Sequence, residues 1–105
     1  MGKLTMIYQN GEVVPVETNK VKLEDMQKLV GGYIETVPYF DTYEGEPCIA
    51  FCDEEGKLKG KARNITATDA WYYGLMSRGI PVEPFSDYLV GDILIVQGAD
   101  LLRKL

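Results

Sequence analysis

Residues 47–64 read PCIAFCDEEGKLKGKARN, and this stretch organises the prediction for the whole chain. It opens with an apolar run typical of a strand, passes through the acidic turn DEEG at residues 53–56, and returns with a cation at every second position. Because successive side chains of a strand point to opposite faces, the alternation predicts a hairpin whose second strand turns its cations to one side. These cations are Lys57, Lys59, Lys61 and Arg63. The residues expected on the face that can meet the core are Leu58, Gly60 and Ala62.

The composition predicts one ordinary globular domain over residues 1–105. With 105 residues and a 46% apolar fraction, the chain can build one core and fold without disulfides. The net charge of −5 argues against a nucleic-acid binder, which needs cations to neutralise phosphates, and against a membrane-surface helix. The charge fits either plain solubility, which is the favoured interpretation, or a protein that faces a basic partner.

The cysteines predict neither a disulfide nor a metal site. Cys48 and Cys52 would share one face of a strand about 13 Å apart, too far to bond to each other, so we expect two reduced, buried thiols. With no histidine and two cysteines, no zinc site is expected, and no cofactor is predicted. The chain starts without an apolar signal segment and has no run of membrane-spanning length, which predicts a cytoplasmic protein of its host cell with no membrane partner.

The first third of the chain predicts a hairpin and a helix. Residues 4–17 place strand formers on both sides of Asn10-Gly11, a strong hairpin signal. Pro15 cannot donate a hydrogen bond to a neighbouring strand, so the second strand is expected at a sheet edge. Residues 22–30 have helical spacing and end at two glycines. The side chains expected to face the sheet are Leu23, Met26, Leu29 and Val30.

A second helix is predicted over residues 67–77. Several N-cap residues precede it, and Thr66 with Asp69 resembles a capping box. Arg78 and Gly79 suit its end, where a cation and a glycine are favoured. The side chains expected to point inward are Ala70, Trp71, Leu75 and Met76. The proline-marked residues 80–85 are expected to be stiff and extended.

The remaining elements complete the predicted fold class. Residues 33–40 predict a strand, and residues 41–47 a polar, acidic loop. Residues 93–96 form a continuous apolar run typical of a central strand. The tail over residues 99–105 is expected to form one helical turn, with Leu101 and Leu102 packed back. Together these elements predict an α+β domain, with a mixed or antiparallel sheet of about five strands and two helices packed on it.

Three motifs carry a family resemblance. They read LVGGYIE at residues 29–35, DEEGKL at residues 53–58 followed by Asn64, and VGDILIV at residues 90–96. In this order and spacing, residues 4–98 resemble the domain of unknown function 3846, a family of small proteins of phages, mobile elements and their bacterial hosts. The resemblance implies a single α+β domain and a phage setting, and it implies no catalytic residue. The chain departs from the pattern between Asn64 and Tyr88, where the family is shorter and more variable.

The residue types argue against an enzyme. The chain has no histidine for acid–base work, and Asp53, Glu54 and Glu55 fall in a turn, where solvated acids are expected. It carries no nucleophile elbow, phosphate-binding loop or dinucleotide fingerprint. Neither cysteine has a neighbour in sequence that would stabilise a thiolate. We therefore predict a protein without catalytic residues.

The alternating cations have two interpretations. The favoured one is a solvated strand whose lysines block edge-to-edge aggregation. The other is an anion site, in which Arg63 holds a phosphate and the N-terminus of the next helix adds N–H donors. Aromatic side chains on that helix could stack a nucleobase, although ordinary amphipathic tyrosines are favoured. The candidate ligand-binding residues are Lys57, Lys59, Lys61, Arg63, Asn64, Thr66, Tyr72 and Tyr73.

Two classes of function follow, both without catalysis. The first is a phage binding protein that sequesters a phosphorylated small molecule, such as a nucleotide signal of host defence. The second is an acidic antagonist that mimics nucleic acid and covers a basic face of a host protein. Its acidic surface would comprise Asp41, Glu44, Glu46, Asp53, Glu54 and Glu55. A structural accessory domain without a ligand is the third alternative. A homo-oligomer would fit the sequestration of a small molecule, because a domain this small has little concave surface of its own.

Overall fold

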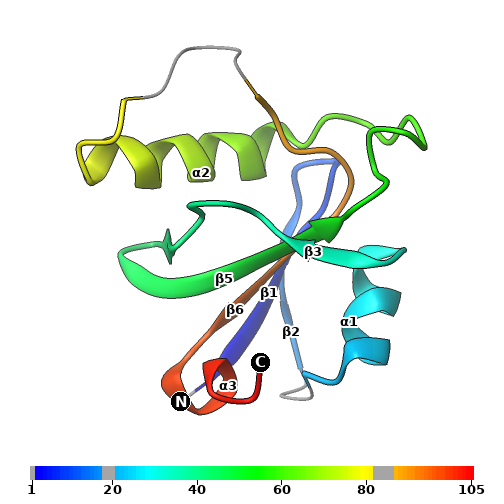
Figure 1. Cartoon of the computed structure of the whole chain (residues 1–105), viewed down its shortest axis with the longest axis horizontal. Coiled ribbons are helices and arrows are strands. Elements are labelled where there is room, and N and C mark those ends of the chain that lie inside the picture. Colours follow the sequence, from blue (N-terminus) through cyan, green and yellow to red (C-terminus); the bar gives the residue numbers. More distant parts are fainter. Residues whose placement is uncertain (1, 18–20, 82–86) are drawn as a thin grey trace.

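The computed structural model describes residues 2–17, 21–81 and 87–105. It confirms the α+β class, with six antiparallel strands and three helices in the described ranges (Figure 1). In chain order the elements are β1 (Lys3–Ile7), β2 (Val13–Val16), α1 (Leu23–Val30), β3 (Ile34–Thr36), β4 (Thr42–Tyr43), β5 (Glu46–Asp53), α2 (Ile65–Ser77), β6 (Ile93–Gln97) and α3 (Ala99–Leu102). The predicted extended segment at residues 80–85 lies largely outside the described residues.

The sheet is built around β6, as its continuous apolar run predicts. The strand order is β2-β1-β6-β5-β3, and β4 pairs with the start of β5. Every residue of β6 is buried, because neighbouring strands flank both of its edges and side chains cover both of its faces. The predicted hairpin is also confirmed: β1 pairs with β2 through a turn in which Gly11 adopts a positive φ of 97°. β2 lies at the sheet edge, where the missing N–H of Pro15 is tolerated.

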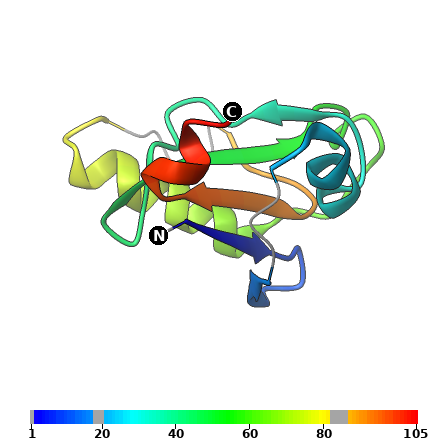
Figure 2. The ribbon, with the colours of Figure 1, turned by 90° about the horizontal axis from the view of Figure 1, so that it is seen from below.

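Helices cover both faces of the sheet. α2 lies on one face, and α1 and α3 lie on the other (Figures 1 and 2). The core is accordingly divided into two clusters of buried side chains, one between the sheet and α2 and one between the sheet and the other two helices. Trp71 and Leu75 belong to the first cluster, while Met26, Val30 and Leu101 belong to the second. This three-layer arrangement leaves the ends of β3 and β5 near α2, where the candidate site forms.

Two helical side chains that were predicted to face the core are exposed instead. Leu23 is exposed because α1 packs on the sheet through its second half, at Met26 and Val30. Met76 is exposed because the inward stripe of α2 is narrower than expected and runs through Trp71 and Leu75. Both helices end where predicted, with Gly31 in the left-handed region after α1, but α2 begins at Ile65, two residues before its predicted start. No helix in the described ranges is long and apolar enough to cross a membrane.

The predicted strand from Lys57 to Arg63 is wrong. Residues 54–60 form successive turns, and Leu58 is 87% exposed rather than facing the core. The reason lies in β5, whose last residues already have neighbours on both edges: Phe51 pairs with Thr36 of β3 and with Leu94 of β6. A returning strand therefore has no free edge to pair with. A single bridge, between Arg63 and Val90, is the remaining ladder contact of this stretch in the described residues.

The strand predicted at residues 33–40 is shorter than expected. β3 covers Ile34–Thr36, and the chain then bends through Tyr39, whose φ of 62° is unusual for a residue other than glycine. The acidic loop at residues 41–47 contains β4, which forms a tight hairpin with the start of β5. The tail is confirmed, since α3 is one helical turn and buries Leu101.

Candidate functional site

Asp53, expected as a solvated turn acid, is a buried structural carboxylate. Its side chain is 1% exposed, and its Oδ2 lies 2.8 Å from Nζ of Lys59 and 2.7 Å from Nζ of Lys61. Its Oδ1 accepts a 2.9 Å hydrogen bond from the N–H of Glu55. Burial alone would raise the pKa of Asp53, but the hydrogen bonds from the lysines and the backbone lower it to about 2. The carboxylate is therefore charged at neutral pH and has no free oxygen to offer a ligand.

Lys61 connects Asp53 to the end of α1. Its Nζ lies 3.2 Å from the carbonyl oxygen of Val30 and 3.5 Å from that of Gly31. A cation is favoured at the carbonyl end of a helix. Gly32 is required here for space, because a Cβ on it would lie 2.6 Å from Oδ2 of Asp53. Of the four alternating cations, Lys61 thus holds the turn against α1, and Lys59 pairs with Asp53.

Asn64 forms a second buried junction. Its side-chain amide donates hydrogen bonds of 2.9 Å to the carbonyl of Ile7 and 2.8 Å to that of Gly91. Its Oδ1 accepts a 3.0 Å hydrogen bond from the N–H of Ala67, which makes Asn64, rather than Thr66, the N-cap of α2. Asn64 is fully buried, so its side chain serves the fold and is not at the surface.

The three family motifs meet at these two junctions. Gly32 of the first motif faces Asp53 of the second motif. Gly56 of the second motif lies against Val90 of the third, because a Cβ on Gly56 would lie 2.9 Å from Cγ2 of Val90. Gly91 of the third motif accepts the hydrogen bond from Asn64. The spacing of the motifs in the sequence therefore reflects contacts that hold the sheet, α1 and α2 together.

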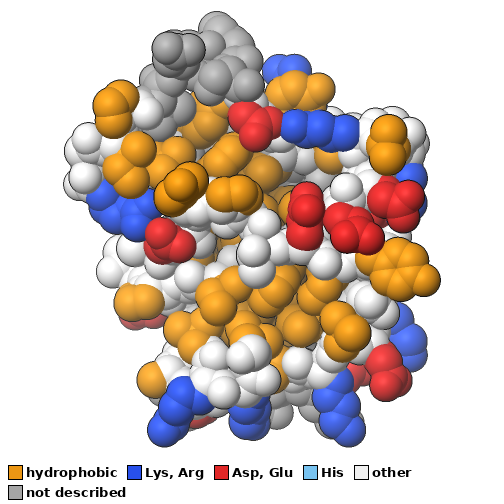
Figure 3. Space-filling model, in the orientation of Figure 1, with side chains coloured by type: hydrophobic (Ala, Val, Ile, Leu, Met, Phe, Trp, Pro, Cys, Tyr) orange, Lys and Arg blue, Asp and Glu red, His pale blue; other side chains and the backbone are white. Residues whose placement is uncertain are grey.

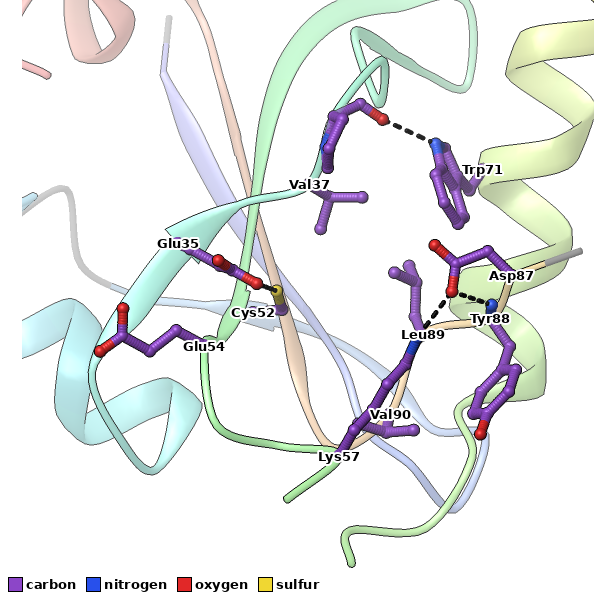
Figure 4. Close-up of a pocket in the computed structure, with 11 residues that line it drawn as sticks. Glu35, Val37, Cys52, Glu54, Lys57, Trp71, Asp87, Tyr88, Leu89 and Val90 are labelled. Atoms are coloured by element: carbon purple, nitrogen blue, oxygen red, sulfur yellow. Dashed lines mark hydrogen bonds and ion pairs between the residues drawn. The ribbon is translucent and has the colours of Figure 1, made fainter. Parts of the chain in front are cut away.

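Beside these junctions lies a cleft of about 150 Å³ between the β3–β5 edge and the residues that precede β6 (Figure 4). Trp71 of α2 forms its inner wall and donates a 3.0 Å hydrogen bond from its indole N–H to the carbonyl of Pro38. We call this space the acidic cleft. It is lined by Glu35, Val37, Pro38, Cys52, Glu54, Lys57, Trp71, Asp87, Tyr88, Leu89 and Val90.

Carboxylates dominate the charge of the acidic cleft. Glu35, Glu54 and Asp87 line it together with a single cation, Lys57, whose Nζ lies 2.6 Å from Oδ1 of Asp87. That pair leaves Glu35 and Glu54 without a cationic partner among the described residues. Acidic side chains accordingly gather around β3 and the end of β5 on the face shown in Figure 3. The cleft therefore has a negative rim and an apolar wall.

The thiol of Cys52 points into the cleft (Figure 4). Its Sγ lies 3.8 Å from Oε1 of Glu35, to which it donates. Burial and the neighbouring Glu35 raise the pKa of Cys52 to about 12. Burial, with Asp41 nearby, likewise raises the pKa of Cys48 to about 12. Both cysteines are free, as expected, and both thiols are protonated at neutral pH; Cys48 is buried as predicted, whereas Cys52 is half-buried because it borders the cleft.

The other two alternating cations, Lys57 and Arg63, both contact the ring of Tyr88 at the outer end of the cleft. Nζ of Lys57 lies 4.6 Å from the centre of its ring, and Cζ of Arg63 lies 4.0 Å from it. Both distances are typical of cation–π contacts. The residues around Tyr88 lie at positions 57, 63 and 87, so neither composition nor periodicity could have placed them together.

The eight candidate ligand-binding residues are therefore dispersed. Lys57 and Arg63 meet at Tyr88, while Lys59 and Lys61 meet at Asp53. Asn64 is buried and Thr66 is half-buried beside the β1–β2 turn, where a Cβ on Gly11 would lie 3.6 Å from its Oγ1. The hydroxyl of Tyr72 donates to the carbonyl of Asp87, and Tyr73 is 71% exposed. Their role in binding a ligand stays a prediction, and Glu35, Asp87 and Tyr88 are the site residues that the sequence analysis missed.

Comparison with known proteins gives a family match. The model of the domain of unknown function DUF3846 matches residues 3–101 and so covers nearly the whole chain. Searches of curated proteins and of solved structures returned no match.

Proposed function

We propose a function for this chain, which belongs to the DUF3846 family. It is a non-catalytic binding protein whose acidic cleft receives a positively charged side chain of a partner protein. The carrying observation is that Glu35 and Glu54 line the acidic cleft without a cation of their own among the described residues. The carboxylate of Glu35 points toward Cys52 and the cleft, and that of Glu54 lies at the outer edge, directed away from Trp71 (Figure 4). A guanidinium or ammonium group with an alkyl stem matches this combination, because the stem fits the apolar wall and the charge meets the acidic rim.

The whole-molecule charge supports the same class of partner. The net charge of −5 steers a basic surface toward this protein and repels an acidic one. Of the acidic residues first considered for such a surface, Asp53 is buried and Asp41 pairs with Arg78 at 3.0 Å. The exposed members of that set without an ion-pair partner among the described residues are Glu44, Glu46, Glu54 and Glu55. In the phage setting that the family resemblance implies, the partner would be a host protein in the cytoplasm, and the chain would act as its antagonist.

The protonated thiols support a role without catalysis. A cysteine nucleophile needs a depressed pKa, whereas burial raises the pKa of Cys52 to about 12. Asp53, whose pKa is lowered to about 2, is held by two lysines away from the cleft.

The chain's single tryptophan allows a direct test, because Trp71 lines the cleft. Titration with an end-blocked arginine–glycine peptide should change the emission of Trp71 in a saturable way. Glu35→Gln and Glu54→Gln should each weaken binding by about 1 kcal/mol, or about fivefold. Glu24→Gln on α1 is the matched control, because it makes the same change in net charge at an exposed residue on the other face of the sheet. Equal weakening by all three variants, or no change in emission, would reject the cleft as the site.

The phosphorylated small molecule remains a second candidate function, supported by Arg63. Its guanidinium lies over Tyr88 and forms no ion pair among the described residues, and α2 begins two residues later with no acidic residue in its first turn. A nucleotide phosphate would meet Arg63 there. If the chain sequesters a nucleotide signal, mono-, di- or cyclic nucleotides should raise its Tm. Arg63→Ala should abolish this rise and Lys59→Ala should not, when each variant is compared with itself in the absence of ligand. If nucleotides at millimolar concentration leave the Tm unchanged, this candidate is excluded.

A further inference from the structure

The two outer edges of the sheet differ in what they offer to a strand of another molecule. β2 forms one edge, and the alternation of its hydrogen bonds to β1 turns Pro15 outward, where an added strand would need an N–H. β3 forms the other edge and contains no proline. Figure 2 shows β3, in cyan, at the upper border of the sheet, with no helix or strand of the described ranges beyond it. A strand from another molecule can therefore pair with β3, whereas Pro15 obstructs pairing with β2.

The free backbone groups of β3 belong to Ile34 and Thr36. In an antiparallel pair, alternate residues of a strand form hydrogen bonds with the neighbouring strand. The N–H of Val37 and the carbonyl of Tyr33 each form a 2.9 Å hydrogen bond on the side of β5, so the residues at positions 33, 35 and 37 are those that bond inward. The N–H and C=O groups of Ile34 and Thr36 therefore point away from β5, and they have no hydrogen-bond partner in the described ranges.

The two faces of the sheet beside this edge differ in chemistry. Glu35 points into the acidic cleft on the side of α2 and has no cationic partner among the described residues (Figure 4). Ile34 points to the opposite face, where it belongs to the same apolar cluster as the partly buried Ile49 and Leu102. Hydrophobic side chains are accordingly visible below the position of β3 in Figure 3. A strand whose side chains alternate between basic and apolar would match both faces.

We propose that the partner of the acidic cleft binds as an extended basic segment that adds to the free edge of β3 as an antiparallel strand. This inference rests on the proposed function and supplies its binding mode. The orientation is that of every strand pair in the described ranges. The added strand exchanges hydrogen bonds with Ile34 and Thr36, and its basic residue lies opposite Glu35. That position is a non-hydrogen-bonded pair, in which opposing side chains lie closest.

The residues that flank the basic residue complete the match. They lie opposite Ile34 and Thr36, so their side chains point to the apolar face and contact Ile34. The recognised segment therefore reads apolar–basic–apolar, and β-branched residues suit its apolar positions because they favour extended backbone.

A second copy of this chain fits the same edge poorly. The register that pairs the whole of β3 with another β3 sets the two Glu35 carboxylates opposite each other. Like charges directly opposite each other destabilise a strand pair. A basic segment instead gains an ion pair with Glu35, and the net charge of −5 attracts it. Charge complementarity thus favours a basic partner over self-association.

Backbone methylation of a peptide tests the added strand separately from the cleft. The probe is the end-blocked peptide Thr-Val-Arg-Val-Thr, titrated against the full chain and followed by the emission of Trp71. In the proposed pairing, the N–H groups of both valines point to β3, whereas that of the arginine points away. N-methylation of either valine should raise the dissociation constant by about fivefold or more. N-methylation of the arginine is the matched control and should change it by less than about twofold.

Substitution of Thr36 tests the same hydrogen bonds from the side of the protein. Thr36→Pro removes the outward N–H and leaves the bonds to β5 in place, as Pro15 does at the edge of β2. Thr36→Val keeps the N–H and is the matched control. We expect Thr36→Pro to weaken binding of the unmethylated peptide by about fivefold or more, and Thr36→Val to leave it near the native value. The methylated peptides are titrated against the native chain, so their result does not depend on the folding of Thr36→Pro.

The outcomes distinguish the added strand from the proposed function. If Glu35→Gln weakens binding of the peptide but methylation of the valines has no effect, the added strand is overturned and the cleft remains the site. Weakening by methylation of the arginine alone overturns the antiparallel pairing. If the unmethylated peptide does not bind, both proposals fail. A doubled mass in sedimentation that Thr36→Pro abolishes assigns the edge to a second copy and overturns the basic segment as its occupant.

Discussion

Asp53 shows how a residue expected to be solvated can hold a fold together. Replacement by Asn keeps the shape and removes the charge that faces Lys59 and Lys61. We expect Asp53→Asn to lower the free energy of unfolding by roughly 2–4 kcal/mol, because a buried pair loses one partner. Urea unfolding measures the change, and Glu54→Gln, one residue further in an exposed position, is the control that should stay near the wild-type value. Equal midpoints for the two variants would refute a structural role for Asp53.

The pH dependence of that stabilisation follows from the lowered pKa. In the unfolded chain an aspartate has a pKa of about 3.9, whereas the pKa of Asp53 in the fold is about 2. Between these values the unfolded chain binds more protons, so the contribution of Asp53 is complete above about pH 4 and is lost as the pH falls toward 2. The difference in unfolding free energy between the native chain and Asp53→Asn should therefore be constant from about pH 7 to 5 and shrink below about pH 4. A difference that stays constant down to about pH 2 would contradict the pKa.

Asn64 and Thr66 both precede the predicted start of α2 as possible N-cap residues, and the structure shows that Asn64 is the cap. Asn64→Ala removes the cap and leaves the carbonyls of Ile7 and Gly91 without their donor. We expect a loss of roughly 2–4 kcal/mol in unfolding free energy. Thr66→Ala should cost less than about 0.5 kcal/mol, since its hydroxyl is not the cap. Thermal or urea unfolding of both variants measures these losses, and similar losses of unfolding free energy would contradict the assignment of Asn64 as the N-cap.

Among the elements, the turns after β5 differ most from expectation. If residues 57–63 formed a strand with Leu58 in the core, Leu58→Ser would cost about 2 kcal/mol or more. The side chain is 87% exposed, so we expect a change below about 0.5 kcal/mol in urea unfolding. Ile95→Ser in the buried centre of β6 provides the contrasting control and should be strongly destabilising. A large loss of unfolding free energy in Leu58→Ser would contradict the exposed turn and support the strand predicted from the sequence.

The elements that depend on a local sequence pattern were predicted correctly. The β1–β2 hairpin follows from Asn10-Gly11, the centre of the sheet follows from the apolar run of β6, and α1 ends at Gly31. The turns after β5 were missed because a strand needs a free neighbour as well as an alternating pattern, and β3 and β6 occupy both edges of β5. Sequence periodicity carries no information about which edges are taken.

The candidate site was hidden for a related reason. Glu35, Trp71 and Tyr88 come from three segments that are distant in the chain, and they meet only after the sheet and α2 have packed. Composition did indicate an acidic protein, but not that a cleft with unpaired carboxylates would form beside the family motifs. The alternating cations attracted attention in the sequence, yet two of them form ion pairs with Asp53 and a third forms one with Asp87.

For the whole molecule, residues of the family motifs join the sheet to α1 and α2, and the proposed function assigns the acidic cleft beside them to a partner protein. An amide-resolved NMR titration of the full chain with the arginine–glycine peptide tests this division most directly. We predict that the perturbed signals gather at β3, at the end of β5, at residues 87–90 and at the indole N–H of Trp71, while those of α1 and β2 stay unchanged. Perturbations confined to α1 or β2, or an unchanged spectrum at high peptide concentration, would contradict the proposed function.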